Sequence, residues 1–212
     1  MSFDLNSVIT GRVWKFGDSI ETDAINPYYR YPSMEELKKH TMEVYRPEFP
    51  HEAKPGDIIV AGRNFGCGSH RPGLVLKEIG IAAIVVESAS RLFLRNSIAL
   101  PMPIFIAPGV GELVADGETL EVDYRNTRLR NVTTGATGAL RKYPPTIEAI
   151  FAAGGLGAFT RRRYLAELAA QASLTLDPAS EGRGKSLPPL GRRVGMREKQ
   201  RFSASSENGE EL

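Results

Sequence analysis

The sequence predicts an α/β fold with a parallel-strand βαβαβ core and an additional β-hairpin. Between residues 57 and 107, short apolar stretches alternate with helical patterns, and this order favours right-handed crossovers on a parallel sheet. Two later stretches, 119–124 and 127–132, flank Arg125-Asn126 and are typical of a hairpin. At 212 residues, the chain is long enough for one domain with its own core.

Turn and capping signals separate the expected elements. A first strand is expected over 11–16, and Ser33 with Glu36 forms a capping box before a helix over 34–43. Gly80 is a typical helix stop. The remaining expected elements, in chain order, are a strand at 57–60, a helix at 74–79, a strand at 81–86, a helix at 89–99 capped by Ser88, a strand at 103–107, and helices at 145–153 and 159–172.

Composition excludes several classes of protein. The formal net charge is only +2, which gives no reason to expect a nucleic-acid partner or a membrane surface. Every apolar run is far shorter than the roughly 18 residues that span a bilayer. The first residues lack a basic segment followed by an apolar one, so no signal peptide is expected. A single cysteine excludes an internal disulfide and fits a cytoplasmic location.

The same residue counts argue against a metal held by this chain alone. Cys67 is the only cysteine, whereas an iron–sulfur cluster normally takes three or four thiolates. The three histidines, His40, His51 and His70, lie at scattered spacings that match no zinc pattern. We therefore expect no metal or cofactor ligands in this chain, and any metal that the protein uses is expected to belong to a partner.

The chain divides into a domain over residues 1–172 and a tail over 173–212. Serine, glycine, proline and charged residues dominate the tail, and the apolar periodicity disappears there. This composition is typical of disorder. A basic stretch at 183–201 could dock on an acidic surface, although a solvated tail is the favoured interpretation.

The run 61–73, AGRNFGCGSHRPG, carries the densest chemistry in the sequence. It lies between an expected strand and an expected helix, where glycines allow a ligand to approach the backbone and helix N–H groups attract anions. Ser69, His70 and Arg71 add a hydroxyl, an imidazole and a guanidinium. Spacing alone favours a capping role for Ser69, and Cys67 is expected to be a small packing residue.

Two stretches resemble the family of 3-isopropylmalate dehydratase small subunits, the swivel domain of the aconitases. Residues 17–30, GDSIETDAINPYYR, are similar to GD-x-I-x-TD-x-I-x-P-x-Y-L-R. Residues 62–71, GRNFGCGSHR, are similar to G-x-NFGCGSSR. Residues 84–97 also look like a family stretch, and the resemblance covers about residues 10 to 160.

The resemblance implies a swivelling β/β/α domain that closes over a separate large subunit. That subunit is expected to carry a 4Fe-4S cluster, which this chain does not hold. The implied reaction is the dehydration and rehydration of a hydroxy di- or tricarboxylic acid. With 3-isopropylmalate as substrate, the enzyme serves leucine biosynthesis.

Motif positions assign roles to individual residues. Ser69 matches the base serine, and Asp23 matches the acidic residue of the TD pair, so both are expected to be catalytic. Arg71 matches a carboxylate-binding arginine, and Arg30 matches the arginine of the substrate-discriminating loop. Arginine suits such a role because its guanidinium binds a carboxylate with two hydrogen bonds. His70 is expected to contact the substrate or to pack locally.

Departures from the family pattern leave alternatives open. The family has a second serine where this chain has His70, and Pro72-Gly73 stands where the family has Glu-His or Glu-Gln. Homoaconitate, citraconate and dimethylmalate therefore remain candidate substrates, and a non-catalytic assembly or regulatory subunit is a further alternative. A nucleotide-binding module is disfavoured because the glycines read G-x-G-x-x-x-x-G, although Glu87 follows at a suitable distance.

Overall fold

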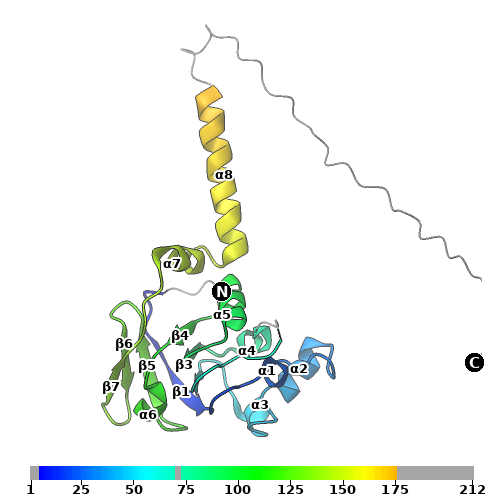
Figure 1. Cartoon of the computed structure of the whole chain (residues 1–212), viewed down its shortest axis with the longest axis vertical. Helices are drawn as coiled ribbons and strands as arrows, with labels where there is room; N and C mark the ends of the chain where they lie inside the picture. The colour runs from blue at the N-terminus through cyan, green and yellow to red at the C-terminus, as the bar shows by residue number, and fades with distance from the viewer. Residues whose placement is uncertain (1–4, 70–72, 176–212) are drawn as a thin grey trace, which may run out of the picture. The chain divides into compact units, whose positions relative to one another are not determined.

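The computed structural model describes residues 5–69 and 73–175. Its strands form one mixed seven-stranded sheet. The strand order is β4-β3-β2-β1-β5-β6-β7 (Figure 1). Neighbours from β4 to β1 are parallel, and neighbours from β1 to β7 are antiparallel. The strands are β1 (Ile9–Lys15), β2 (Ile58–Ala61), β3 (Ala83–Val86), β4 (Ile104–Ile106), β5 (Thr119–Asp123), β6 (Arg128–Asn131) and β7 (Thr137–Ala139).

Helices connect and cover these strands. The segment β2-α4-β3-α5-β4 is the predicted parallel βαβαβ core, and β5-β6 is the predicted hairpin, to which β7 adds a third strand. The helices are α1 (Thr22–Ile25), α2 (Met34–His40), α3 (Phe49–Glu52), α4 (Leu74–Ile79), α5 (Arg91–Ala99), α6 (Val110–Leu113), α7 (Pro145–Ala152) and α8 (Leu156–Thr175).

The first strand joins the parallel and antiparallel halves of the sheet. The end of β1 pairs in parallel with β2, with Val13 opposite Ile58. The beginning of β1 pairs antiparallel with β5, with Ile9 opposite Val122. Because β1 lies between segments that are distant in the sequence, it holds the crossover core and the hairpin in one sheet.

Helix ends follow the capping signals with one exception. The Ser33 hydroxyl accepts the N–H of Glu36, and Gly80 ends α4 with a φ of 96°, as predicted. The cap of α5 was predicted at Ser88, and this is wrong. The Ser90 hydroxyl accepts the N–H of Phe93 instead, while the Ser88 hydroxyl accepts the N–H of Asn64 in the glycine-rich loop.

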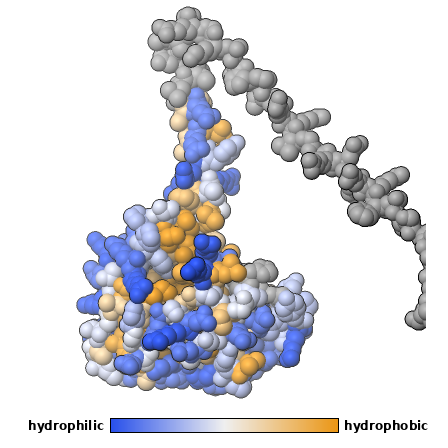
Figure 2. Space-filling model, viewed as in Figure 1, coloured by the Kyte–Doolittle hydropathy of each residue, from blue (hydrophilic) through white to orange (hydrophobic). Residues whose placement is uncertain are grey.

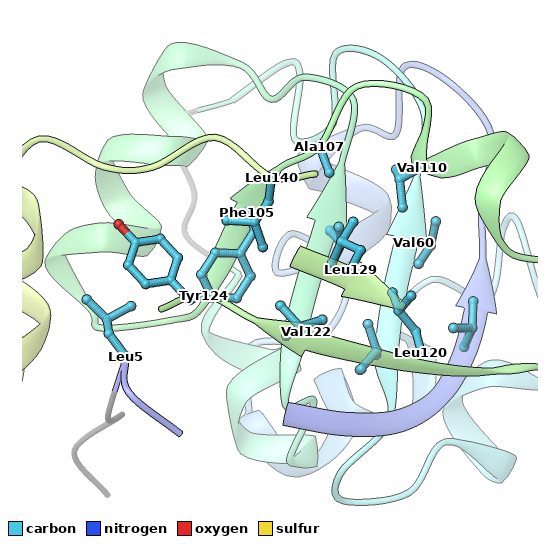
Figure 3. Close-up of a cluster of buried hydrophobic side chains, with 14 of the residues drawn as sticks. Leu5, Val60, Phe105, Ala107, Val110, Leu120, Val122, Tyr124, Leu129 and Leu140 are labelled. Atoms are coloured by element: carbon cyan, nitrogen blue, oxygen red, sulfur yellow. The ribbon is translucent and has the colours of Figure 1, made fainter. Parts of the chain in front are cut away.

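Two apolar cores lie on the two faces of the parallel strands. Ile58 and Val60 belong to one core, while Ile59 and Ala61 belong to the other, because successive strand residues point to opposite faces. Figure 3 shows the first core, in which β5 and β6 side chains such as Leu120 meet β2. Helices α1–α4 pack on the other core, so they lie on the side that carries the glycine-rich loop.

The last described helix runs further than expected, from Leu156 to Thr175. Figure 2 shows apolar residues at the surface near α7 and the start of α8, where Leu156 is exposed. The division between a domain at 1–172 and a disordered tail at 173–212 stays a prediction, because residues 176–212 lie outside the described part. Within residues 5–69 and 73–175, no helix has the length and apolar character required to cross a bilayer.

Candidate active site

Three loops meet at the carboxyl edge of the parallel strands, where ligands commonly bind in such sheets. They follow β1, β2 and β3, and backbone hydrogen bonds join them. The N–H of Gly66 donates to the carbonyl of Ile20 at 2.8 Å. The N–H of Phe65 donates to the carbonyl of Ser88 at 3.0 Å. The two sequence motifs are therefore adjacent in space, as parallel pairing requires.

The glycine-rich loop packs closely on α5. Gly66 has a φ of +73°, and a Cβ there would lie 2.2 Å from Cγ of Phe93. Its carbonyl also accepts the hydroxyl of Ser90. Only glycine satisfies both the backbone conformation and the close approach, so a side chain at position 66 would displace the loop that leads to Ser69.

Ser69 lies beside Asp23, the other residue expected to be catalytic. The Ser69 hydroxyl donates to Oδ1 of Asp23 at 3.2 Å. Asp23 belongs to α1, whose first residue, Thr22, donates its N–H to the carbonyl of Cys67 at 2.8 Å. Ser69 is half-buried and Asp23 is exposed, so the pair is open to a ligand.

Arg30 lines a pocket of about 280 Å³ together with Asp23. Asp23 thus connects the Ser69 hydroxyl with the pocket that contains the predicted discriminating arginine. Besides this pair, the wall is composed of two carboxylates, a histidine and small or aromatic residues: Glu21, Ala24, Pro27, Tyr29, Tyr31, His40, Glu43, Val44 and Tyr45.

The pocket wall formed by His40 was missed by the sequence reasoning. Nδ1 of His40 lies 2.8 Å from Oε2 of Glu43, and its ring stacks on Tyr31 with 3.7 Å between ring centroids. The only sequence signal was that Glu43 follows His40 by three positions, which places the two side chains on one side of a helical turn. Nothing local indicated that Tyr31 would cover them.

Three further expectations concern residues around Ser69. His70 and Arg71, predicted to bind substrate, lie outside the described residues, and their roles stay predictions. Cys67 is half-buried, and its thiol lies 3.6 Å from the carbonyl of Ile20. This contact is consistent with packing.

The residues of this chain do not fit a resident iron–sulfur cluster. Cys67 is the single thiol in the sequence. Among the described residues, no three His, Cys, Asp or Glu side chains are grouped as metal ligands. The groups that this chain contributes to the site are the Ser69 hydroxyl, the Asp23 carboxylate and the Arg30 guanidinium.

Comparisons with known proteins give the family. Residues 4–104 match the aconitase C-terminal domain. The 3-isopropylmalate dehydratase small subunit 1 of Methanopyrus kandleri is 44% identical over 163 residues, which cover 74% of this chain and 95% of that protein. The chain belongs to the family of 3-isopropylmalate dehydratase small subunits.

Other members of the small-subunit family agree with this assignment. The methanogen homoaconitase small subunit of Methanothermobacter thermautotrophicus is 42% identical over 156 residues, covering 72% of this chain and 90% of that protein. A crystal structure of 3-isopropylmalate dehydratase from Methanocaldococcus jannaschii aligns with a TM-score of 0.71 and 35% identity, covering 77% of this chain and 99% of that one. The predicted α/β swivel fold is thereby confirmed.

Proposed function

We propose that this chain is the small subunit of a heteromeric hydro-lyase that isomerises 3-isopropylmalate and 2-isopropylmalate in leucine biosynthesis. A large subunit is its partner. We further propose that this partner carries the family's 4Fe-4S cluster, because this chain offers one thiol. The cytoplasmic location and the lack of nucleic-acid and membrane partners stay predictions from the sequence.

The contact between Ser69 and Asp23 carries the proposal. The carbon that loses a proton in such a reaction is adjacent to a carboxylate and is weakly acidic, so its base must be strong and close. The Ser69 hydroxyl is the proposed base, and Asp23 accepts its hydrogen bond at 3.2 Å. Asp23 is the group to which the serine proton can move, and Ser69 returns a proton when the double bond is hydrated.

The pocket beside this pair supports isopropylmalate over a substrate with a third carboxylate. Arg30 can hold one substrate carboxylate through two hydrogen bonds. Pro27, Tyr29 and Val44 offer apolar surface for an isopropyl group. Three carboxylates line the same pocket, those of Glu21, Asp23 and Glu43. They would repel an additional distal carboxylate such as that of homoaconitate.

The test is a hydration assay on this chain co-expressed anaerobically with a cluster-bearing large subunit. Isopropylmalate, homoaconitate, citraconate and dimethylmalate are compared as substrates. Ser69→Ala is expected to lower kcat by about 10²–10⁴-fold, the usual contribution of a general base. Cys67→Ala is the matched control in the same loop and should retain activity, because its thiol donates to a backbone carbonyl, that of Ile20.

Each other outcome indicates a different function. Full activity of the Ser69→Ala complex would identify an assembly subunit, whereas activity only on homoaconitate would contradict the substrate assignment. Binding of NAD or ATP by the isolated chain would favour a nucleotide-binding module.

A further inference from the structure

The hydroxyl of Thr22 lies directly against Ser69. Thr22 is only 1% exposed, and its Oγ1 lies 3.0 Å from Oγ of Ser69. The same oxygen accepts the backbone N–H of Ser69 at 2.8 Å. A Cβ on Gly68 would lie 3.4 Å from this oxygen, and the φ of +95° at Gly68 turns the chain so that Ser69 faces Thr22.

The number of protons on the two hydroxyls determines which of them donates in the contact between Thr22 and Ser69. An ionised carboxylate accepts but cannot donate, so the single hydroxyl proton of Ser69 is used in its bond to Asp23. A threonine hydroxyl has one proton and can also accept. Since Oγ1 of Thr22 already accepts the Ser69 N–H, its proton is left to point at Oγ of Ser69.

We propose that Thr22 is a positioning residue that orients Ser69 by donating a hydrogen bond to its hydroxyl oxygen. This inference rests on the proposed function, in which Ser69 is the base. A donor aimed at an oxygen favours the anionic form of that oxygen, and a preorganised donor has the largest effect where charge develops during the reaction. Thr22 therefore assists Ser69 without contacting the substrate.

The test compares Thr22→Val with Thr22→Ser in the complex with the large subunit. Valine keeps the shape and removes the hydroxyl, whereas serine keeps the hydroxyl. Thr22→Val is expected to lower kcat by about 10²-fold, in the range for one lost oxyanion donor, with KM changed little. The acidic limb of its kcat/KM profile, along which activity rises as the base loses its proton, should move to higher pH. Thr22→Ser should restore kcat to within a few-fold and the profile to its original position.

Several results would overturn the proposal. One is a Thr22→Val complex with an unchanged pH profile, and another is a Thr22→Ser complex as impaired as the valine variant, which would indicate a packing role for the methyl group. Thr22→Ala offers a second hydroxyl-free variant if the valine protein does not bind the large subunit. An active Ser69→Ala complex would instead refute the proposed function, so the two failures are distinguishable.

Discussion

The carboxylate of Asp18 occupies the space in which Gly62 would carry a side chain. A Cβ on Gly62 would lie 1.9 Å from Oδ1 of Asp18, and this same oxygen accepts the N–H of Arg63 at 2.7 Å. The first motif is thus joined to the second through a carboxylate that only a glycine admits.

Gly62→Ala is therefore expected to displace the Asp18 carboxylate and break its bond to the Arg63 N–H. Such overpacking costs about 1–3 kcal/mol, and the displaced loop should also lower activity with the large subunit. Chemical denaturation and the hydration assay measure the two effects. Gly17→Ala is a matched control, because a Cβ there meets nothing within 4 Å and should cost less. Equal losses in both variants would contradict the argument.

Two tyrosines in the first core should differ sharply in what their hydroxyls contribute. The Tyr124 hydroxyl donates to Glu148 and accepts the N–H of Tyr143, each at 2.8 Å. The Tyr143 hydroxyl is buried and has no hydrogen-bond partner in the described part of the chain. Burial raises the pKa of Tyr124 to about 12, so its hydroxyl stays protonated near neutral pH.

Tyr124→Phe is consequently expected to destabilise the fold by about 1–3 kcal/mol, because it leaves the Tyr143 N–H without its acceptor. Tyr143→Phe should be neutral or slightly stabilising, since it removes an unpaired buried hydroxyl. Urea denaturation of the two variants gives the comparison. A larger cost for Tyr143→Phe would show that its hydroxyl has a partner in the folded protein.

Asp116 should make stability depend on pH in the acidic range. Burial opposes ionisation of its carboxyl, but hydrogen bonds from Arg46 and from the N–H of Lys15 outweigh this and lower its pKa. A carboxyl whose pKa is lower in the folded state contributes stability above its unfolded value, near 3.9, and loses it as pH falls through the folded value. The Asp116 side chain is 42% exposed, so solvent screens the pair with Arg46.

Asp116→Asn should therefore cost less than about 1 kcal/mol at pH 7. This cost should shrink as pH falls below about 4, where the wild-type carboxyl becomes protonated. Urea denaturation over a pH series measures it. Glu35→Gln is the control, because its side chain is 84% exposed and lies 3.9 Å from Lys38. A cost of Asp116→Asn that grows toward acid would reverse the assigned sign.

Arg30 should govern substrate preference. Because Arg30 lines the pocket beside Asp23, Arg30→Lys removes two-point carboxylate binding while keeping the charge. We expect kcat/KM for isopropylmalate to fall by about tenfold or more, since a charged hydrogen bond contributes about 1.5–3 kcal/mol. The ratio between isopropylmalate and homoaconitate should change as well. Arg63→Lys, at a side chain that is 77% exposed, is the control; an unchanged ratio for Arg30→Lys would remove the assignment.

Local signals predicted much of the fold, and long-range contacts account for what they missed. Ser33 and Gly80 act within one helical turn, so their patterns are visible in the sequence. The predicted cap at Ser88 is wrong because a long-range contact uses its hydroxyl, which accepts the N–H of Asn64 from the glycine-rich loop, while Ser90 caps α5.

In the candidate site, too, residues within a motif were predicted and residues placed by long-range contacts were not. Ser69, Asp23 and Arg30 were predicted from contiguous motifs, and the structure brings Ser69 to Asp23 and Asp23 to the Arg30 pocket. The wall at His40 could not be predicted, because it depends on where the turn after α2 lies against α1. In that turn the N–H of Met42 donates to the carbonyl of Ala24, a pairing that no local pattern encodes.

The central position of β1 has a consequence for synthesis of the protein. β1 leaves the ribosome first among the strands, yet Ile9 pairs with Val122. At 5–20 residues per second, the partner follows on the order of ten seconds later. During this interval the edge of β1 that will pair with β5 has unpaired backbone groups, even after β2 has paired with the other edge, and such an edge promotes association with other chains.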